Sequence, residues 1–125
     1  MLNLSKEKKY LLACSGGPDS MALFKMLLNN NISFDVALVN YHKRKESVIE
    51  EESVRNYCLM HNIEFYLLDT RILNVTGNFQ SWARKVRYDF FSEIINKGGY
   101  DALLTAHQKD DLIETYIFQK RRKGN

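Results

Sequence analysis

Short apolar runs alternate along the chain with longer segments whose apolar residues recur at helical spacing. Four of these runs, residues 10–14, 36–41, 65–68 and 102–106, are continuous and have the length of strands. Such runs are typical of strands buried inside a sheet. The pattern therefore predicts four buried strands separated by helices.

The first two predicted helices have recognisable ends. Pro18 suits the first turn of a helix that continues to the asparagines at 29–31. The second helix carries apolar residues at helical spacing between positions 54 and 59 and ends at Asn62. Glutamates 50–52 lie toward its start, where the helix dipole favours negative charge.

Two further helices are expected in the second half of the chain. A loop at residues 70–77 leads to a third helix, which Asn78 can cap. This helix runs to about Lys97, where the glycines at 98–99 provide a left-handed stop. A fourth helix is predicted to begin near Asp110.

The alternation of strands and helices requires crossover connections and a parallel sheet. We expect a single α/β domain over residues 1–125, with a parallel sheet of at least four strands, helices on both faces and a Rossmann-like arrangement. Ligands of such sheets bind beyond the carboxyl ends of the strands. Functional residues are therefore expected where strands end.

Composition excludes several classes of protein. No apolar stretch approaches the ~18 residues that a membrane span requires, and the N-terminus is charged where a signal peptide is apolar. Cys14 and Cys58 are isolated, so they indicate neither a disulfide framework nor a zinc or iron–sulfur site. We expect a soluble, cytoplasmic protein with no membrane contact. The basic residues 120–125 suit an RNA partner or form a solvated tail, and both readings stay open.

The first polar cluster directly follows the first strand. It consists of Ser15, Gly16, Gly17, Pro18, Asp19 and Ser20. Two glycines let backbone N–H groups converge on a phosphate, and the helix start adds positive partial charge, so we expect the loop to bind phosphate groups. Asp19 would repel phosphates unless a cation lay between them, which predicts a magnesium ligand. The alternative is a glycine turn in which Asp19 only stabilises the helix start.

The second cluster begins at the end of the fourth strand. On the expected helix, Asp111 and Glu114 share a face, and Asp110 lies four residues before Glu114. Acids so close together repel one another, which predicts a bound metal ion or amine between them. His107 could orient a substrate or exchange a proton. The alternatives are acids that only stabilise a helix start and a histidine with a structural hydrogen bond.

The third cluster lies on the third helix. Arg84 and Arg87 are three residues apart and point the same way, an arrangement that suits phosphates or a nucleic-acid backbone. The alternative is a solvated basic face. The aromatic residues of this helix are expected in the core rather than as platforms for bases: Trp82, Tyr88, Phe90 and Phe91. Tyr41 and His42, at the end of the second strand, could edge an adenine pocket.

Four segments of the sequence resemble known motifs. The loop SGGPDS is similar to the SGGxDS signature of the PP-loop ATP pyrophosphatases, which split ATP between its α- and β-phosphates. Residues 39–44, 78–91 and 106–115 resemble successive motifs of the tRNA(Ile)-lysidine synthase family, in the order of that family. The resemblance covers nearly the whole chain.

This resemblance implies a reaction and its participants. The enzyme would use ATP and Mg²⁺ to adenylate C2 of the wobble cytidine in an isoleucine tRNA with a CAU anticodon. Lysine would then displace AMP, so that lysidine, AMP and pyrophosphate are the products. The resemblance leaves open whether the chain forms a homodimer.

The resemblance also implies roles for individual residues. The glycine loop would bind pyrophosphate, with Asn40 as a further nucleotide-binding residue, and Asp19 and Asp111 would hold magnesium. The catalytic residues would be Asp111, Glu114 and His107, with Glu114 receiving the lysine ammonium or taking its proton. The residues that would contact the RNA are Arg84, Arg87 and Arg122.

Members of the family continue beyond this length, so we expect residues 1–125 to lack the last strand and the C-terminal tRNA-binding region of full-length relatives. Two other enzyme functions fit the same fold, namely tRNA thiolation and an amidating synthetase. The isolated Cys14 and Cys58 argue against thiolation, which commonly uses paired cysteines. A non-catalytic ATP-binding module is a third reading, against which Asp111 and Glu114 count.

Overall fold

The computed structural model describes residues 4–42, 45–75, 77–106 and the backbone of 113–116. Five strands, three α-helices and one short 3₁₀ helix are found in these residues. In chain order they are β1 (Lys9–Ala13), α1 (Pro18–Asn29), β2 (Ser33–Asn40), α2 (Ser47–Met60), β3 (Phe65–Asp69), η1 (Thr70–Ile72), α3 (Phe79–Gly98), β4 (Ala102–Ala106) and β5 (Ile113–Tyr116).

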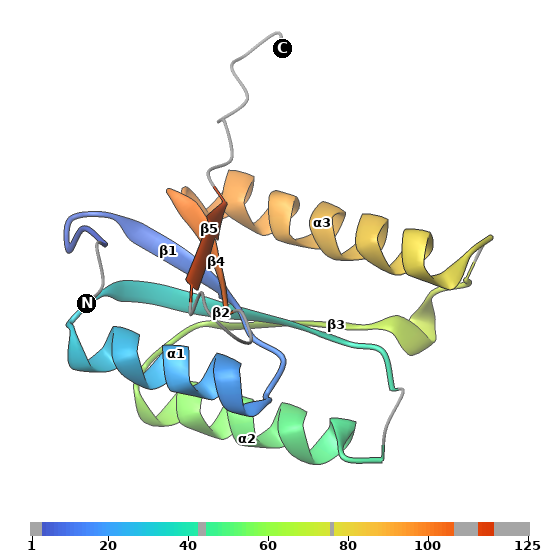
Figure 1. The fold of residues 1–125 in the computed structure, drawn as a ribbon, viewed down its shortest axis with the longest axis horizontal. Coiled ribbons are helices and arrows are strands. Elements are labelled where there is room, and N and C mark those ends of the chain that lie inside the picture. Colours follow the sequence, from blue (N-terminus) through green and yellow to red (C-terminus); the bar gives the residue numbers. More distant parts are fainter. Residues whose placement is uncertain (1–3, 43–44, 76, 107–112, 117–125) are drawn as a thin grey trace, which may run out of the picture.

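The strands form one sheet in the order β3-β2-β1-β4-β5. The first four strands of this order are mutually parallel, whereas β5 runs antiparallel to β4. Helices α1 and α2 lie against one face of the sheet and α3 lies against the other (Figure 1). The predicted parallel α/β sheet with helices on both faces is confirmed.

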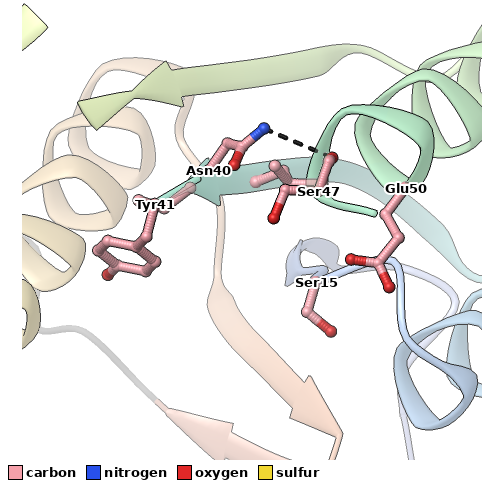
Figure 2. Close-up of a pocket in the computed structure, with 7 residues that line it drawn as sticks. Ser15, Asn40, Tyr41, Ser47 and Glu50 are labelled. Atoms are coloured by element: carbon pink, nitrogen blue, oxygen red, sulfur yellow. Dashed lines mark hydrogen bonds between the residues drawn. The ribbon is translucent and has the colours of Figure 1, made fainter. Parts of the chain in front are cut away.

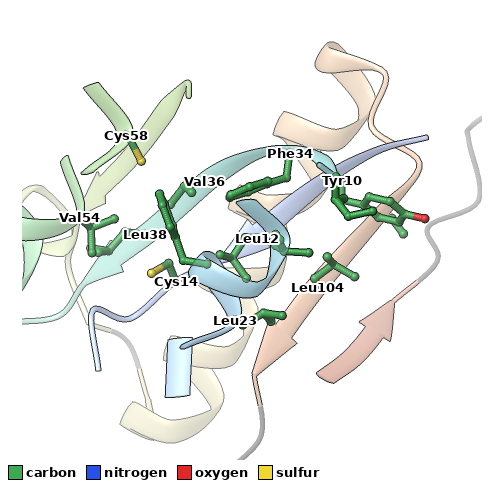
Figure 3. Close-up of a cluster of buried hydrophobic side chains, with 14 residues drawn as sticks. Tyr10, Leu12, Cys14, Leu23, Phe34, Val36, Leu38, Val54, Cys58 and Leu104 are labelled. Atoms are coloured by element: carbon green, nitrogen blue, oxygen red, sulfur yellow. The ribbon is translucent and has the colours of Figure 1, made fainter. Parts of the chain in front are cut away.

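Alternate side chains of the central strands divide the core into two halves. Leu12 and Val36 point to the side of α1 and α2, where they join a cluster that includes Phe24 (Figure 3). Leu11 points to the opposite side and packs in a second cluster with Phe91 of α3. Because both faces of β1 are buried, this strand reads as an uninterrupted apolar run in the sequence.

The helix ends follow the signals expected from the sequence. Pro18 occupies the first turn of α1. The side chain of Asn78 caps α3 by accepting hydrogen bonds from the amides of Gln80 at 2.8 Å and Ser81 at 3.2 Å. Gly99 ends that helix in the left-handed conformation, with φ of 69°.

The expected fourth helix is wrong for residues 113–116, which form β5 instead. Ile113, Thr115 and Tyr116 are β-branched or aromatic, and such residues favour strands. Pairing of Ile113 with Ala106 of β4 completes the ladder. Glu114 therefore belongs to a strand, and the helix face that it was expected to share with Asp111 does not extend to it. Within the expected 70–77 loop, Thr70–Ile72 form a 3₁₀ turn.

The order of the strands creates a switch point at β1. The chain passes from β1 to β2 on one side, whereas β4 pairs with β1 on the other side. The segments that follow β1 and β4 therefore start side by side at the carboxyl edge of the sheet and lead away in different directions. Ligands of such folds bind at this point. Ala106 and Ile113 pair with each other, so both described ends of the 107–112 segment lie at this edge.

Candidate functional site

The turn between β1 and α1 is held by hydrogen bonds within itself. The amide of Ser15 donates to Oγ of Ser20 at 3.2 Å, and the two hydroxyl oxygens lie 3.1 Å apart. The amide of Gly17 donates to Oγ of Ser15 at 3.2 Å. These contacts fix the path of the loop before any ligand binds.

Gly16 brings the loop against α2. Its φ of 85° lies in the left-handed region, which residues with a side chain rarely adopt. A Cβ atom at this position would meet Cβ of Glu50 at 2.8 Å. Glycine is thus required twice, for the conformation of the turn and for the close approach of the two segments.

The N-terminus of α1 opens onto the same turn. Gly17 is the N-cap residue, and no side chain of the described residues caps the helix. The first helical bond runs from the amide of Met21 to the carbonyl of Gly17 at 3.0 Å. Within the described part of the chain the amides of Asp19 and Ser20 find no acceptor, so they can donate to a bound anion.

A cavity of about 250 Å³ lies between this loop and the carboxyl end of β2. Its walls come from three elements, the loop, the end of β2 and the first turn of α2 (Figure 2). The lining residues are Ser15, Leu38, Val39, Asn40, Tyr41, Ser47 and Glu50. A mixed polar and apolar lining beside a helix N-terminus suits a ligand that combines a phosphate with an apolar ring.

Asn40 organises the wall of the cavity. Its side-chain nitrogen donates to Oε1 of Glu51 at 2.9 Å, and its side-chain oxygen accepts from the amide of His42 at 2.9 Å. Its backbone carbonyl accepts from the hydroxyl of Thr70 at 3.0 Å. Asn40 is buried, and these bonds connect the end of β2 to α2 and to the turn after β3.

A charged cluster joins the ends of β2 and β3. Nε2 of His42, a residue with φ of 56°, lies 2.8 Å from Oδ1 of Asp69. The Arg71 guanidinium donates to Oδ2 of Asp69 at 2.7 Å. This guanidinium, followed by the Arg71 amide and His42, holds the pKa of the Asp69 carboxyl well below its usual range. The carboxylate therefore remains charged in mildly acidic solution.

Tyr41 turns from the cavity wall toward α3. Its hydroxyl donates to the carbonyl of Ala83 at 3.1 Å. Burial raises the pKa of Tyr41, and the positive charge of Arg87 opposes that rise. The end of β2 and the first half of α3 are therefore in direct contact near the cavity.

The arginines of α3 lie around an aromatic ring. The guanidinium carbons of Arg84 and Arg87 are 5.6 and 5.4 Å from the ring centroid of Tyr88. Phe91 is buried in the core, and Phe90 packs against it, as expected. Trp82 and Tyr88 were expected in the core as well, but each is only half-buried and neither belongs to the described core clusters. That expectation is wrong for these two rings, because neither packs into the clusters that join the helices to the sheet.

Several predicted residues lie outside the described part of the chain. They are His107, Asp111 and Arg122, together with the side chain of Glu114. Asp19 is described and lies in the first turn of α1. Among the described residues, no group of three or more histidines, cysteines, aspartates or glutamates could hold a metal ion by itself.

The sequence did not single out two residues of the cavity, Ser47 and Glu50. Both belong to the first turn of α2, and Glu50 was interpreted only as a favourable charge near a helix start. A signal was present, because a helix that follows a strand begins at the carboxyl edge of a parallel sheet. The first turn of each helix is therefore a candidate part of the site.

Comparison with protein families decides the class of this site. The family described as the PP-loop domain matches residues 1–125. The chain belongs to the PP-loop domain family. This family uses ATP, which agrees with a loop at the switch point of the sheet and a cavity beside that loop.

Relatives of this PP-loop domain are tRNA(Ile)-lysidine synthases. The enzyme of Mycoplasmopsis pulmonis is 44% identical over 113 residues, which cover 90% of this chain and 39% of that protein. The enzyme of Malacoplasma penetrans is 41% identical over 94% of this chain and 41% of its own length. That of Campylobacter jejuni is 37% identical over 98% of this chain and 37% of its own length. The chain thus spans about two fifths of these relatives.

A solved structure has the same fold. The U34-tRNA thiolase NcsA from Methanococcus maripaludis, with its [4Fe-4S] cluster, matches with a TM-score of 0.65. The match covers 84% of this chain and 40% of the thiolase at 20% sequence identity.

Within the residues that the structure describes, no helix is long and apolar enough to cross a membrane.

Replacement of Gly16 by alanine tests the close approach of the loop to α2. We expect Gly16→Ala to reduce the free energy of unfolding and to weaken ATP binding at least about tenfold, since a left-handed alanine costs ~1–2 kcal/mol and its Cβ meets Glu50. Gly77→Ala is the matched control, because Gly77 also has a positive φ, of 65°, but a Cβ added to it would meet no described atom beyond its chain neighbours within 4 Å. Urea unfolding and ATP titration measure both effects. Equal losses of ATP affinity in the two variants would contradict the packing argument.

Acidification tests the charged cluster at Asp69. Because the pKa of Asp69 is lowered in the folded chain, its carboxylate stabilises the fold above the ordinary carboxyl pKa of about 3.9. That stability is lost as the pH falls through the folded pKa. We expect Asp69→Asn to lower the urea midpoint of unfolding at pH 7. Below about pH 5, the midpoint of this variant should fall less steeply with pH than that of the unmodified chain. Asp89→Asn, which breaks an exposed pair with Lys85, should leave both nearly unchanged.

Proposed function

We propose that this PP-loop domain carries the catalytic site of a tRNA(Ile)-lysidine synthase, a carbon–nitrogen ligase. The observation that carries the proposal is the Ser15–Ser20 loop, which follows β1 at the switch point of the sheet and borders a cavity through Ser15. Relatives named tRNA(Ile)-lysidine synthase resemble the chain over nearly its whole length. The substrates are then ATP, lysine and an isoleucine tRNA with a CAU anticodon, and the reaction takes place in the cytoplasm.

The loop would bind the phosphates that leave as pyrophosphate. The amides of Asp19 and Ser20 at the start of α1 and the hydroxyls of Ser15 and Ser20 are donors for phosphate oxygens. The adjoining cavity, lined by Leu38, Val39 and Tyr41, would receive the nucleoside. In this arrangement the α-phosphate would lie between the loop and the cavity, and the RNA base would approach it there.

The chemistry occurs in two steps. The carbonyl oxygen at C2 of the cytidine attacks the α-phosphorus of ATP, and the bond to the β-phosphate breaks to release pyrophosphate. The lysine amine then attacks C2, loses a proton and expels AMP. Asp111 and Glu114 would take up the lysine and its proton, and His107 would assist at the same edge.

Magnesium would offset the charge of the phosphates in the first step. The described residues fit this ion in part, since Asp19 supplies a carboxylate beside the phosphate loop. Magnesium is commonly bound by one or two carboxylates together with substrate phosphates and water. Asp19 and Asp111 would be its protein ligands. Arg84, Arg87 and Arg122 would contact the RNA, whose phosphates pair well with guanidinium groups.

Two other functions fit this chain less well. Thiolation commonly needs reactive cysteines, but Cys14 and Cys58 are buried, and burial raises the pKa of these thiols to about 11 and about 12. Such thiols stay protonated at neutral pH and are poor nucleophiles. A module that only binds ATP would not need the acids at Asp111 and Glu114.

Formation of lysidine tests the proposal. The chain is incubated with ATP, magnesium, lysine and unmodified isoleucine tRNA, and the wobble base is analysed by mass spectrometry. We expect lysidine to form, and Asp111→Asn to reduce its rate by about 100-fold or more while the fold is retained. Asp89→Asn on α3 is the matched control and should remain active.

Three results would contradict the proposal. Near-normal activity of Asp111→Asn would refute the role of that acid. Incorporation of sulfur without lysine would indicate a thiolase. Binding of ATP without any turnover would favour the non-catalytic module.

A further inference from the structure

Three aromatic rings form a cluster of their own beside the cavity. The ring centroids of Tyr41 and Phe79 are 5.9 Å apart, and those of Phe79 and Trp82 are 5.7 Å apart. All three rings are half-buried, and none belongs to either described core cluster. We call Tyr41, Phe79 and Trp82 the aromatic cluster. It is separate from the two clusters that pack the sheet against its helices.

The aromatic cluster is fixed to the site by its first member. Tyr41 lines the cavity, and its hydroxyl bond to the Ala83 carbonyl ties the ring to α3. The Tyr41 ring is directed away from Ser15 and Glu50, toward α3 (Figure 2). Phe79 is the first residue of α3, and Trp82 follows three residues later, so the two side chains are neighbours on the helix surface. The cluster therefore extends from the mouth of the cavity along the start of α3.

Positive charge lies next to the rings. Arg87 is close enough to Tyr41 to act on its hydroxyl, and it also lies against the ring of Tyr88. The guanidinium of Arg84 also lies against the ring of Tyr88. Half-buried aromatic rings beside arginines are the combination with which proteins bind single-stranded nucleic acids, because bases stack on the rings while cations contact the phosphates.

We infer that the aromatic cluster is a stacking platform for an unpaired base of single-stranded RNA, whose adjacent phosphate is contacted by Arg87. The inference rests on the proposed function, in which an RNA base must enter the site. It adds a subsite that holds a second base outside the cavity, next to the base that reacts. Stacking tolerates any base, so this subsite would orient the RNA strand without reading its sequence.

Trp82 is the only tryptophan of the chain, so its fluorescence reports directly on this subsite. We would titrate the full chain with a short single-stranded RNA and with the same backbone lacking its bases. Stacking predicts saturable quenching of Trp82 by the intact RNA and weak quenching, with lower affinity, by the abasic RNA. Equal binding and equal quenching by both RNAs would overturn the inference, because charge alone would then explain binding.

Substitution supplies an independent measurement. Trp82→Leu should weaken binding of fluorescently labelled RNA by about 5- to 100-fold, as loss of one stacking partner does, and should leave ATP affinity unchanged. Phe65→Leu is the matched control, because Phe65 is also a half-buried ring with an arginine, Arg55, 5.1 Å from its centroid. Phe65 is the first residue of β3, so it lies at the amino ends of the strands, whereas the aromatic cluster lies at their carboxyl ends. Equal RNA affinity of Trp82→Leu and the unmodified chain would also overturn the inference.

The lysidine assay separates failure of this inference from failure of the proposed function. If lysidine forms but the RNA does not quench Trp82, the stacking platform is wrong and the function stands. If intact RNA quenches Trp82 and no lysidine forms, the platform stands and the assigned reaction is wrong.

Discussion

The contact between Gly16 and Glu50 is the constraint on which the rest of the site depends. It lets the turn after β1 lie directly against α2, so that the loop and the end of β2 enclose one cavity. The left-handed φ of Gly16 also turns the chain toward α1, whose first amides find no acceptor among the described residues. A side chain at this position would push the loop away from α2 and so separate two walls of the cavity.

The sequence predicted those parts of the fold whose causes are local. Pro18, Asn78 and Gly99 mark helix ends through backbone geometry and capping, which depend on a few neighbouring residues. The buried strands were visible because both of their faces are covered. Residues 113–116 were read as helix because the spacing of nearby acids outweighed the β-branched and aromatic residues, and pairing with β4 decides the outcome.

The candidate site was predictable only in part, for a physical reason. The glycine loop is recognisable because its residues form one continuous segment, whereas Ser47 and Glu50 join the site only through the packing of α2 against distant segments. Likewise, a tryptophan on an amphipathic helix looks like a core residue until the sheet is in place. Trp82 then proves to lie outside both core clusters and beside Phe79, a contact that periodicity alone does not reveal.

Mapping of backbone amides by NMR during titration with ATP and magnesium tests the central claim most directly. If the loop binds the phosphates, the largest chemical-shift changes will occur at Gly16, Gly17, Asp19 and Ser20, with smaller changes at the end of β2. Adenosine, which lacks phosphates, should shift the end of β2 and leave the loop nearly unchanged. Largest changes at the opposite edge of the sheet, around Tyr100, would contradict the account.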